Sequence, residues 1–93
     1  MRWDTQDPRS LEAEVRKLLA EVNPDRADDI ADLPRDAPLL GIVDSRRLLE
    51  MVEQLERVFG IRVDQAQFTP ENFESLEKVV AFVTRELRRA VRS

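Results

Sequence analysis

The chain has 93 residues, 42% of them hydrophobic and 37% charged, with a net charge of −4. This length supports one domain with a small core, and the composition is typical of a folded helical domain and unlike that of a disordered chain. Because the sequence holds no cysteine and no histidine, disulfides, thiolate catalysis, Cys/His zinc sites and histidine-based catalytic triads are excluded.

Charge and hydropathy also bear on where the protein acts and what it binds. The start, Met1-Arg2-Trp3-Asp4, lacks the apolar segment of a secretory signal, and no run of about 18 apolar residues predicts a membrane span. The acidic balance disfavours nucleic acid and anionic membranes as main partners. We therefore expect a cytoplasmic, monomeric protein whose partners are other proteins.

The first predicted element is a helix that begins after a polar segment. Residues 1–9 predict a flexible N-terminal tail, and residues 10–93 predict the folded domain. Ser10 is the candidate N-cap, and Asn23-Pro24 predicts the end of the helix, because the residue before a proline disfavours the helical conformation. One apolar face with helical spacing lies between them, formed by Leu11, Val15, Leu18, Leu19 and Val22.

A long connection, residues 23–43, follows this helix. A structureless connection of this length is uncommon and indicates either a function or an additional element; one helical turn is expected near Asp28–Ala31. Four apolar residues are expected to hold the connection to the core: Ile30, Leu33, Leu39 and Leu40. Its acidic residues lack the alternating spacing and the glycine of a calcium loop, so no metal site is predicted at Asp25, Asp28, Asp29 and Asp32.

The segment from Asp44 to Phe59 predicts the second helix. Asp44 is a strong N-cap, and Gly60 stands just past the C-terminus. The predicted inner face consists of Leu48, Met51, Val52, Leu55, Val58 and Phe59. The opposite face carries Arg46, Glu50, Glu53 and Arg57, with Leu49 at its border. Two pairs on this face are four residues apart, so the charges either pair along the helix or face a partner.

Ser45 is the first helical residue if Asp44 is the cap. Its hydroxyl then lies at the positive end of the helix dipole, which favours any anionic group attached there. No residue nearby in the sequence could activate this serine as a nucleophile, and no general base or metal site can be assembled. No catalytic residue is therefore assigned, and an enzyme is not expected.

The C-terminal third predicts a connector and two helices. Ile61-Arg62-Val63 is expected to bury its two apolar residues, and Thr69-Pro70-Glu71 predicts the start of a short helix over residues 70–74. The last helix has an inner face of Leu76, Val79, Val80, Val83, Leu87 and Val91. Its end is rich in cations that complement the helix dipole, with a nucleic-acid patch as the alternative: Arg85, Arg88, Arg89 and Arg92.

Ser75-Leu76-Glu77-Lys78 matches the Ser-x-x-Lys pattern of acylating enzymes. Leu76 belongs to the apolar face of the last helix, and none of the companion motifs follows. We therefore assign no acylating activity to this segment.

Three segments together resemble the acyl carrier protein family, which includes the peptidyl and aminoacyl carriers. They are Asp36-Ala37-Pro38-Leu39-Leu40-Gly41-Ile42-Val43-Asp44-Ser45, Leu55-Glu56-Arg57-Val58-Phe59-Gly60-Ile61-Arg62-Val63 and Thr69-Pro70-Glu71-Asn72-Phe73-Glu74-Ser75-Leu76. The resemblance covers roughly residues 10–88. It implies an all-α, four-helix bundle with three longer helices, one short helix and a long loop between the first and second.

The resemblance also implies a function. Ser45 would receive 4′-phosphopantetheine from coenzyme A through a phosphopantetheinyl transferase, and the thiol of that arm would carry an acyl or aminoacyl thioester. A loading enzyme and a downstream synthase or transferase would be the further partners. The expected protein is a free-standing carrier in a specialised polyketide, lipid or nonribosomal peptide pathway; the alternative is an interaction module of the same shape that is not phosphopantetheinylated.

The sequence departs from the family pattern directly after the serine. Arg46-Arg47 stands where the family usually has Leu or Met, and two cations in a first turn oppose the helix dipole by about 0.3–1 kcal/mol each. A phosphodiester on Ser45 could offset this, as could pairing with Glu50 and Asp44. The expected partner-binding residues are Asp44, Arg46, Arg47, Leu49, Glu50 and Glu53. Together, Arg46, Arg47 and Arg57 favour a dedicated partner over general fatty-acid enzymes.

Overall fold

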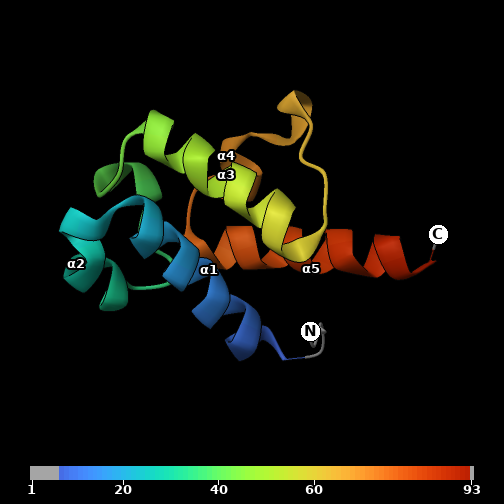
Figure 1. Ribbon diagram of the computed structural model, residues 1–93, viewed down its shortest axis with the longest axis horizontal. Coiled ribbons are helices and arrows are strands. Elements are labelled where there is room, and N and C mark those ends of the chain that lie inside the picture. The colour runs from blue at the N-terminus through green and yellow to red at the C-terminus, as the bar shows by residue number, and fades with distance from the viewer. Residues whose placement is uncertain (1–6, 93) are drawn as a thin grey trace.

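The computed structural model describes residues 7–92, and the side chains of all of these except residues 8 and 90–92. All regular structure in this part of the chain is helical (Figure 1): α1 (Pro8–Val22), α2 (Ala27–Ala31), α3 (Ser45–Phe59), α4 (Pro70–Phe73) and α5 (Leu76–Arg92). Short 3-10 turns occur at Pro24–Arg26, Leu39–Gly41 and Gln65–Gln67. The predicted all-α bundle of three longer helices is confirmed, and α2 lies where one helical turn was expected near Asp28–Ala31.

The core lies between the three longer helices. Figure 1 shows α1 and α3 running obliquely to α5, and α1 packs against both of its long neighbours. The buried residues of α1 and α3 belong to the predicted faces: Leu11, Val15, Leu18, Leu19, Leu48, Met51, Val52, Leu55 and Phe59. Those of α5 are Leu76, Val79, Val80, Phe82 and Val83.

Phe82 is a core residue that the sequence analysis did not assign to the inner face of α5. Its ring lies 5.2 Å from that of Phe73, which in turn lies 5.3 Å from that of Phe68. The apolar face of α5 is therefore wider than predicted, because α4 covers a second side of this helix. Leu87, predicted inside, is half-buried, and Val91 is outside the described side chains.

Two predicted N-caps differ in the structure. Asp7 caps α1 and Ser10 does not: Oδ1 of Asp7 accepts a hydrogen bond from the Arg9 amide at 3.1 Å. Pro8 suits the first helical position, where no amide hydrogen is needed, so the helix begins before Ser10. Thr69 precedes α4 as predicted, but its side chain makes no capping bond. Residues 1–6, including Trp3, lie outside the described residues.

The predicted ends of α1 and α3 are confirmed. Asn23 follows the last residue of α1, and its buried side-chain amide donates to the Leu19 carbonyl at 3.1 Å. Gly60 ends α3 with φ of +67°, in the left-handed region that favours glycine, and its amide donates to the Glu56 carbonyl. In the connector after it, Ile61 is buried and Val63 is half-buried.

The long connection contacts the core through three of the four predicted residues. Ile30 and Leu39 are fully buried and Leu33 is half-buried. Leu40, expected to be buried, is instead 63% exposed. The reason is the 3-10 turn at Leu39–Gly41: with three residues per turn, neighbouring side chains point about 120° apart, so only one of the two leucines can face the core.

Arg16 holds α2 against α1 through its guanidinium group. Nη1 donates to the carbonyl oxygens of Ile30 and Leu33, each at 2.7 Å, at the C-terminal end of α2. Its Nη2 is 3.0 Å from Oε2 of Glu12, whose Oε1 pairs with Arg35 at 3.0 Å. One cation therefore satisfies carbonyl groups that the short helix cannot pair internally.

Backbone hydrogen bonds attach the rest of the connection to the C-terminal helices. The Leu39 amide donates to the Glu74 carbonyl at 2.8 Å, and the Glu77 amide donates to the Arg35 carbonyl at 2.9 Å. The chain before α3 is thus fixed at one end by α1 and at the other by α4 and α5. This segment has a defined path although it contains little helix.

Replacing Arg16 tests this attachment. We expect Arg16→Met to lower the free energy of unfolding by about 2 kcal/mol, because hydrogen bonds from a charged donor are lost and carbonyls are left unpaired. Urea denaturation followed by circular dichroism measures the change. The matched control is Lys17→Met on the exposed side of the same helix, expected within about 0.5 kcal/mol of wild type. Equal stability of the two variants would contradict the role of Arg16.

The two neighbouring leucines provide a second, internally controlled test. Leu39→Ala should destabilise the fold by about 2–5 kcal/mol, because it leaves a cavity at a fully buried position. Leu40→Ala should change stability by less than about 0.5 kcal/mol, because its side chain faces solvent. Thermal unfolding of both variants measures the change. A larger loss of stability for Leu40→Ala than for Leu39→Ala would show that the turn buries Leu40 and exposes Leu39.

Candidate functional site

The start of α3 has the geometry that the sequence predicts. Asp44 is the N-cap in an extended conformation, with φ of −86° and ψ of 171°. Its Oδ1 accepts a hydrogen bond from the Arg47 amide at 2.8 Å. Ser45 is the first residue of the 15-residue helix and is exposed. The serine hydroxyl is therefore accessible at the positive end of a long helix.

The approach to Ser45 is fixed by buried side chains and backbone bonds. Val43 is 5% exposed, and the amides of Ile42 and Val43 both donate to the Leu39 carbonyl, at 3.0 and 2.9 Å. Leu39 itself is bonded to the segment after α4. The serine is thus exposed on a segment whose preceding residues are anchored in the core.

The two cations after the serine have different surroundings. Nη1 of Arg47 donates to the Val22 carbonyl at 2.5 Å, and its Nε lies 4.0 Å from Oε1 of Glu50. Its charge therefore lies at the C-terminus of α1, where the helix dipole favours a cation. Arg46 is exposed and makes no hydrogen bond or ion pair with another described residue. The unfavourable interaction with the dipole of α3 is thus relieved for Arg47 and remains for Arg46.

The remaining predicted site residues lie on the same helix. Leu49 is 48% exposed, Glu50 is half-buried and Glu53 is exposed. The ion pairs Arg46/Glu50 and Glu53/Arg57, considered from their spacing, do not form among the described residues, because Arg47 takes the partner of the first pair. Arg46, Leu49 and Glu53 are therefore available on the outer surface of α3.

Two exposed leucines flank the serine. Leu40 and Leu49 are the large hydrophobic residues that remain exposed in the described part of the chain. Leu49 was placed at the border of the outer face from the sequence, whereas Leu40 was expected to be buried. The adjacent leucines before a glycine were a usable signal for Leu40, since a tight turn buries only one of them. Scattered exposed leucines are ordinary, and these two lie on the turn before Ser45 and on the helix after it.

An apolar groove of about 200 Å³ lies beside Leu40. Leu48 of α3 and Phe73 of α4 line it, together with Phe68 from the segment before α4. No short-range pattern could have identified this groove, because its walls come from three segments that are distant in the sequence. Leu48, which lines this groove, follows Ser45 by three residues in α3, so the groove lies near the serine.

The described residues contain no group of three or more acidic side chains that could hold a metal ion. Ser75, from the Ser-x-x-Lys segment, is buried, and its hydroxyl accepts a hydrogen bond from the Lys78 amide at 3.3 Å. It therefore caps the start of α5. Within residues 7–92, none of the helices has the length and apolar character needed to cross a bilayer.

Comparison with known proteins agrees with this geometry. Residues 13–83 match the family model described as the phosphopantetheine attachment site. The D-alanyl carrier proteins of Streptococcus sanguinis (strain SK36) and Streptococcus gordonii (strain Challis) are each 32% identical over 80 residues. Each alignment covers 86% of this chain and 98% of the relative. No solved structure gave a significant match.

These matches extend over most of the chain and include the whole of α3. The family carries its intermediates on a covalently attached 4′-phosphopantetheine and does not itself catalyse a reaction. The chain therefore belongs to the phosphopantetheine-bearing carrier proteins, and it is a carrier and not an enzyme.

Proposed function

We propose that Ser45 is the residue that receives 4′-phosphopantetheine. The observation that carries this proposal is an exposed serine in the first position of a 15-residue helix, directly after a capping aspartate. It lies within the segment that matches the attachment-site family. The other described serines serve the backbone or a neighbouring cap: Ser10 donates to Asp7, and Ser75 is buried.

The surroundings of Ser45 fit a phosphodiester. The helix start offers positive potential to an anion, and the carboxylate of Asp44 is already engaged by the Arg47 amide. Arg46 adds an unpaired cation in the same turn. When attached, the arm supplies a terminal thiol that holds a carboxylic acid as a thioester. The residues of the protein fix the attachment point of the arm, and the thiol end remains accessible to partner enzymes.

We propose an amino acid as the cargo, held as an aminoacyl thioester, with D-alanine the first candidate. The support is the similarity to D-alanyl carrier proteins along nearly their whole length. A small, charged amino acid needs no internal cavity. This would make the protein an aminoacyl carrier; the polyketide, lipid and nonribosomal peptide pathways expected from the sequence are not supported by these relatives.

A short acyl chain is the second candidate, and the apolar groove favours it. The groove of about 200 Å³ is lined mainly by apolar side chains, so it could accept a short acyl chain of a few carbon atoms. Leu48 and Phe73 would then contact the chain. Longer fatty-acid or polyketide chains would extend beyond the groove into solvent or into a partner.

We propose that partners bind the outer surface at the start of α3. A phosphopantetheinyl transferase and a loading enzyme would both contact Leu49 and Arg46, with Leu40 adding apolar area. Asp44, Glu50 and Glu53 would supply acidic contacts at the border. Arg47 would act from within, by holding the helix start against α1. Arg46 calls for an acidic group on the partner; a cytoplasmic location and a monomeric state remain predictions.

Intact-protein mass spectrometry tests the attachment. After incubation with coenzyme A and a broad-specificity phosphopantetheinyl transferase, the wild type should gain the mass of one phosphopantetheinyl group. Ser45→Ala should gain none, and Ser10→Ala, a control at another exposed serine, should gain one. If a folded wild type gains nothing with several transferases, the chain is an interaction module of the same shape, and the proposal is wrong.

The thermal stability of loaded forms tests the cargo. A D-alanyl thioester should leave the Tm of the holo protein unchanged, because the amino acid stays outside the groove. Each methylene that enters the groove would contribute about 0.8 kcal/mol, so a hexanoyl thioester that occupies it would raise the Tm by several degrees. Such a rise, abolished by narrowing the groove with Leu48→Phe, would favour the second candidate over the first.

A further inference from the structure

Two neighbouring grooves run along α1. One, of about 500 Å³, lies between α1 and α2; the other, of about 520 Å³, lies between α1 and α5. Arg9, Glu12 and Arg35 line both, so the grooves form one continuous surface. Arg9 lies about 20 Å along the helix from Val22, where Arg47 attaches the start of α3.

Cations dominate the rims of these grooves. We define the basic face as Arg9, Lys17, Arg35 and Arg88. The side chains of Arg9, Lys17 and Arg88 are exposed and form no hydrogen bond or ion pair with other described residues. Arg35 pairs with Glu12, but Glu12 is shared with Arg16, so one carboxylate serves two cations. The surface therefore keeps an excess of positive charge.

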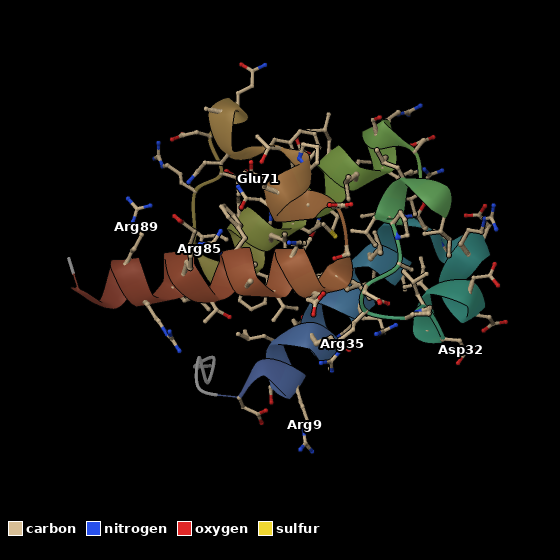
Figure 2. All side chains as sticks on the ribbon, turned by 180° about the vertical axis from the view of Figure 1, so that it is seen from behind. Arg9, Asp32, Arg35, Glu71, Arg85 and Arg89 are labelled. Carbon is tan, nitrogen blue, oxygen red and sulfur yellow. The ribbon has the colours of Figure 1, made fainter. Side chains whose placement is uncertain are left out.

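This excess is a local feature and not a property of the whole chain. The sequence has 19 acidic and 15 basic residues, so the remaining surface is strongly acidic. Figure 2 shows Arg9 and Arg35 on the α1 side of the molecule, whereas Arg89 lies on the opposite side of α5. Arg85 is bonded to Asn72 at 2.9 Å and Arg89 to Glu86 at 3.1 Å. Arg85 lines the groove between α1 and α5 but has Asn72 as a partner, and Arg89 lines neither groove, so neither residue is counted in the basic face.

The grooves have floors of small side chains between the charged rims. Ala13, Ala20, Ala27 and Ala31 line the first, and Ala81 and Thr84 line the second. Such floors allow a peptide backbone to approach closely, while its carboxylates meet the rim cations. An extended peptide can follow a groove between two helices, whereas a flat bilayer surface would contact only the exposed cations beside it. The shape and the charge together favour an acidic polypeptide.

We propose that the basic face docks an acidic segment of a partner protein. The site is separate from Ser45, so a partner held there leaves the phosphopantetheine arm free to move. Complementary charge raises the rate of encounter and is screened by salt. The carrier would thereby have two docking surfaces. The one at the start of α3 binds enzymes that act on the arm, and the one on the basic face keeps the carrier bound to its partner protein.

A charge-reversal experiment tests the basic face. The probe is a short fluorescein-labelled poly-glutamate peptide, and its binding to the full chain is followed by fluorescence anisotropy at low and physiological salt. We expect saturable, salt-sensitive binding that Arg9→Glu/Arg88→Glu weakens about tenfold, because two attractive rim contacts become repulsive. Lys17→Glu, tested separately, shows whether the peptide also contacts the groove between α1 and α2.

The matched control is Arg57→Glu/Arg62→Glu, which makes the same change of net charge at exposed positions outside the grooves. It should bind the peptide like wild type. Equal weakening by both double variants, or no binding by wild type, would overturn the proposal. So would binding to vesicles of phosphatidylglycerol and phosphatidylcholine, lost in Arg9→Glu/Arg88→Glu, without binding to the peptide.

Two further measurements keep the outcomes separable. Circular dichroism establishes that each variant is folded, and Arg9→Lys/Arg88→Lys, which keeps the charges, should retain peptide binding. Both charge-reversed variants should still gain one phosphopantetheinyl group. If no form of the protein, wild type included, gained a phosphopantetheinyl group, the proposal for Ser45 would be wrong. The peptide-binding result tests only the basic face.

Discussion

The guanidinium of Arg16 is the interaction on which the path of the chain between α1 and α3 depends. It pairs two carbonyls at the end of α2, and with Glu12 it links Arg35 to α1. Residues 34–43 contain only one short 3-10 turn, so side-chain and interhelical bonds must replace the hydrogen bonds that a helix would supply. Because this segment leads into Asp44, the placement of Ser45 follows from an attachment made on another helix.

The charges at the start of α3 favour the attachment of an anionic group. Asp44 caps the backbone, and Arg47 turns its charge to the end of α1, where a cation is favourable. Arg46 alone keeps an unpaired charge beside the serine. The exposed leucines on either side and the cation between them form a surface that differs from the basic face in composition and position. One small domain therefore presents two surfaces of different chemistry.

Sequence periodicity predicted the three long helices, because each buries a single continuous face, and it predicted Asp44 and Gly60 because capping is local. It failed where the outcome depends on segments distant in the sequence. Leu40 is exposed because the 3-10 turn buries Leu39 in its place, and Phe82 is buried because α4 covers it. Arg16 carried no signal, since its partners are backbone carbonyls that only the fold brings near. The two grooves along α1 were undetectable for the same reason.

The fold forms the surface that carries the phosphopantetheine arm before the arm is attached. The most direct test compares ¹H–¹⁵N NMR spectra of the protein before and after modification. Amide shifts should be confined to residues 40–49, while those of Arg9, Lys17 and Arg88 stay unchanged. Shifts spread through α1 and α5 would contradict the account, because they would mean that attachment reorganises the bundle.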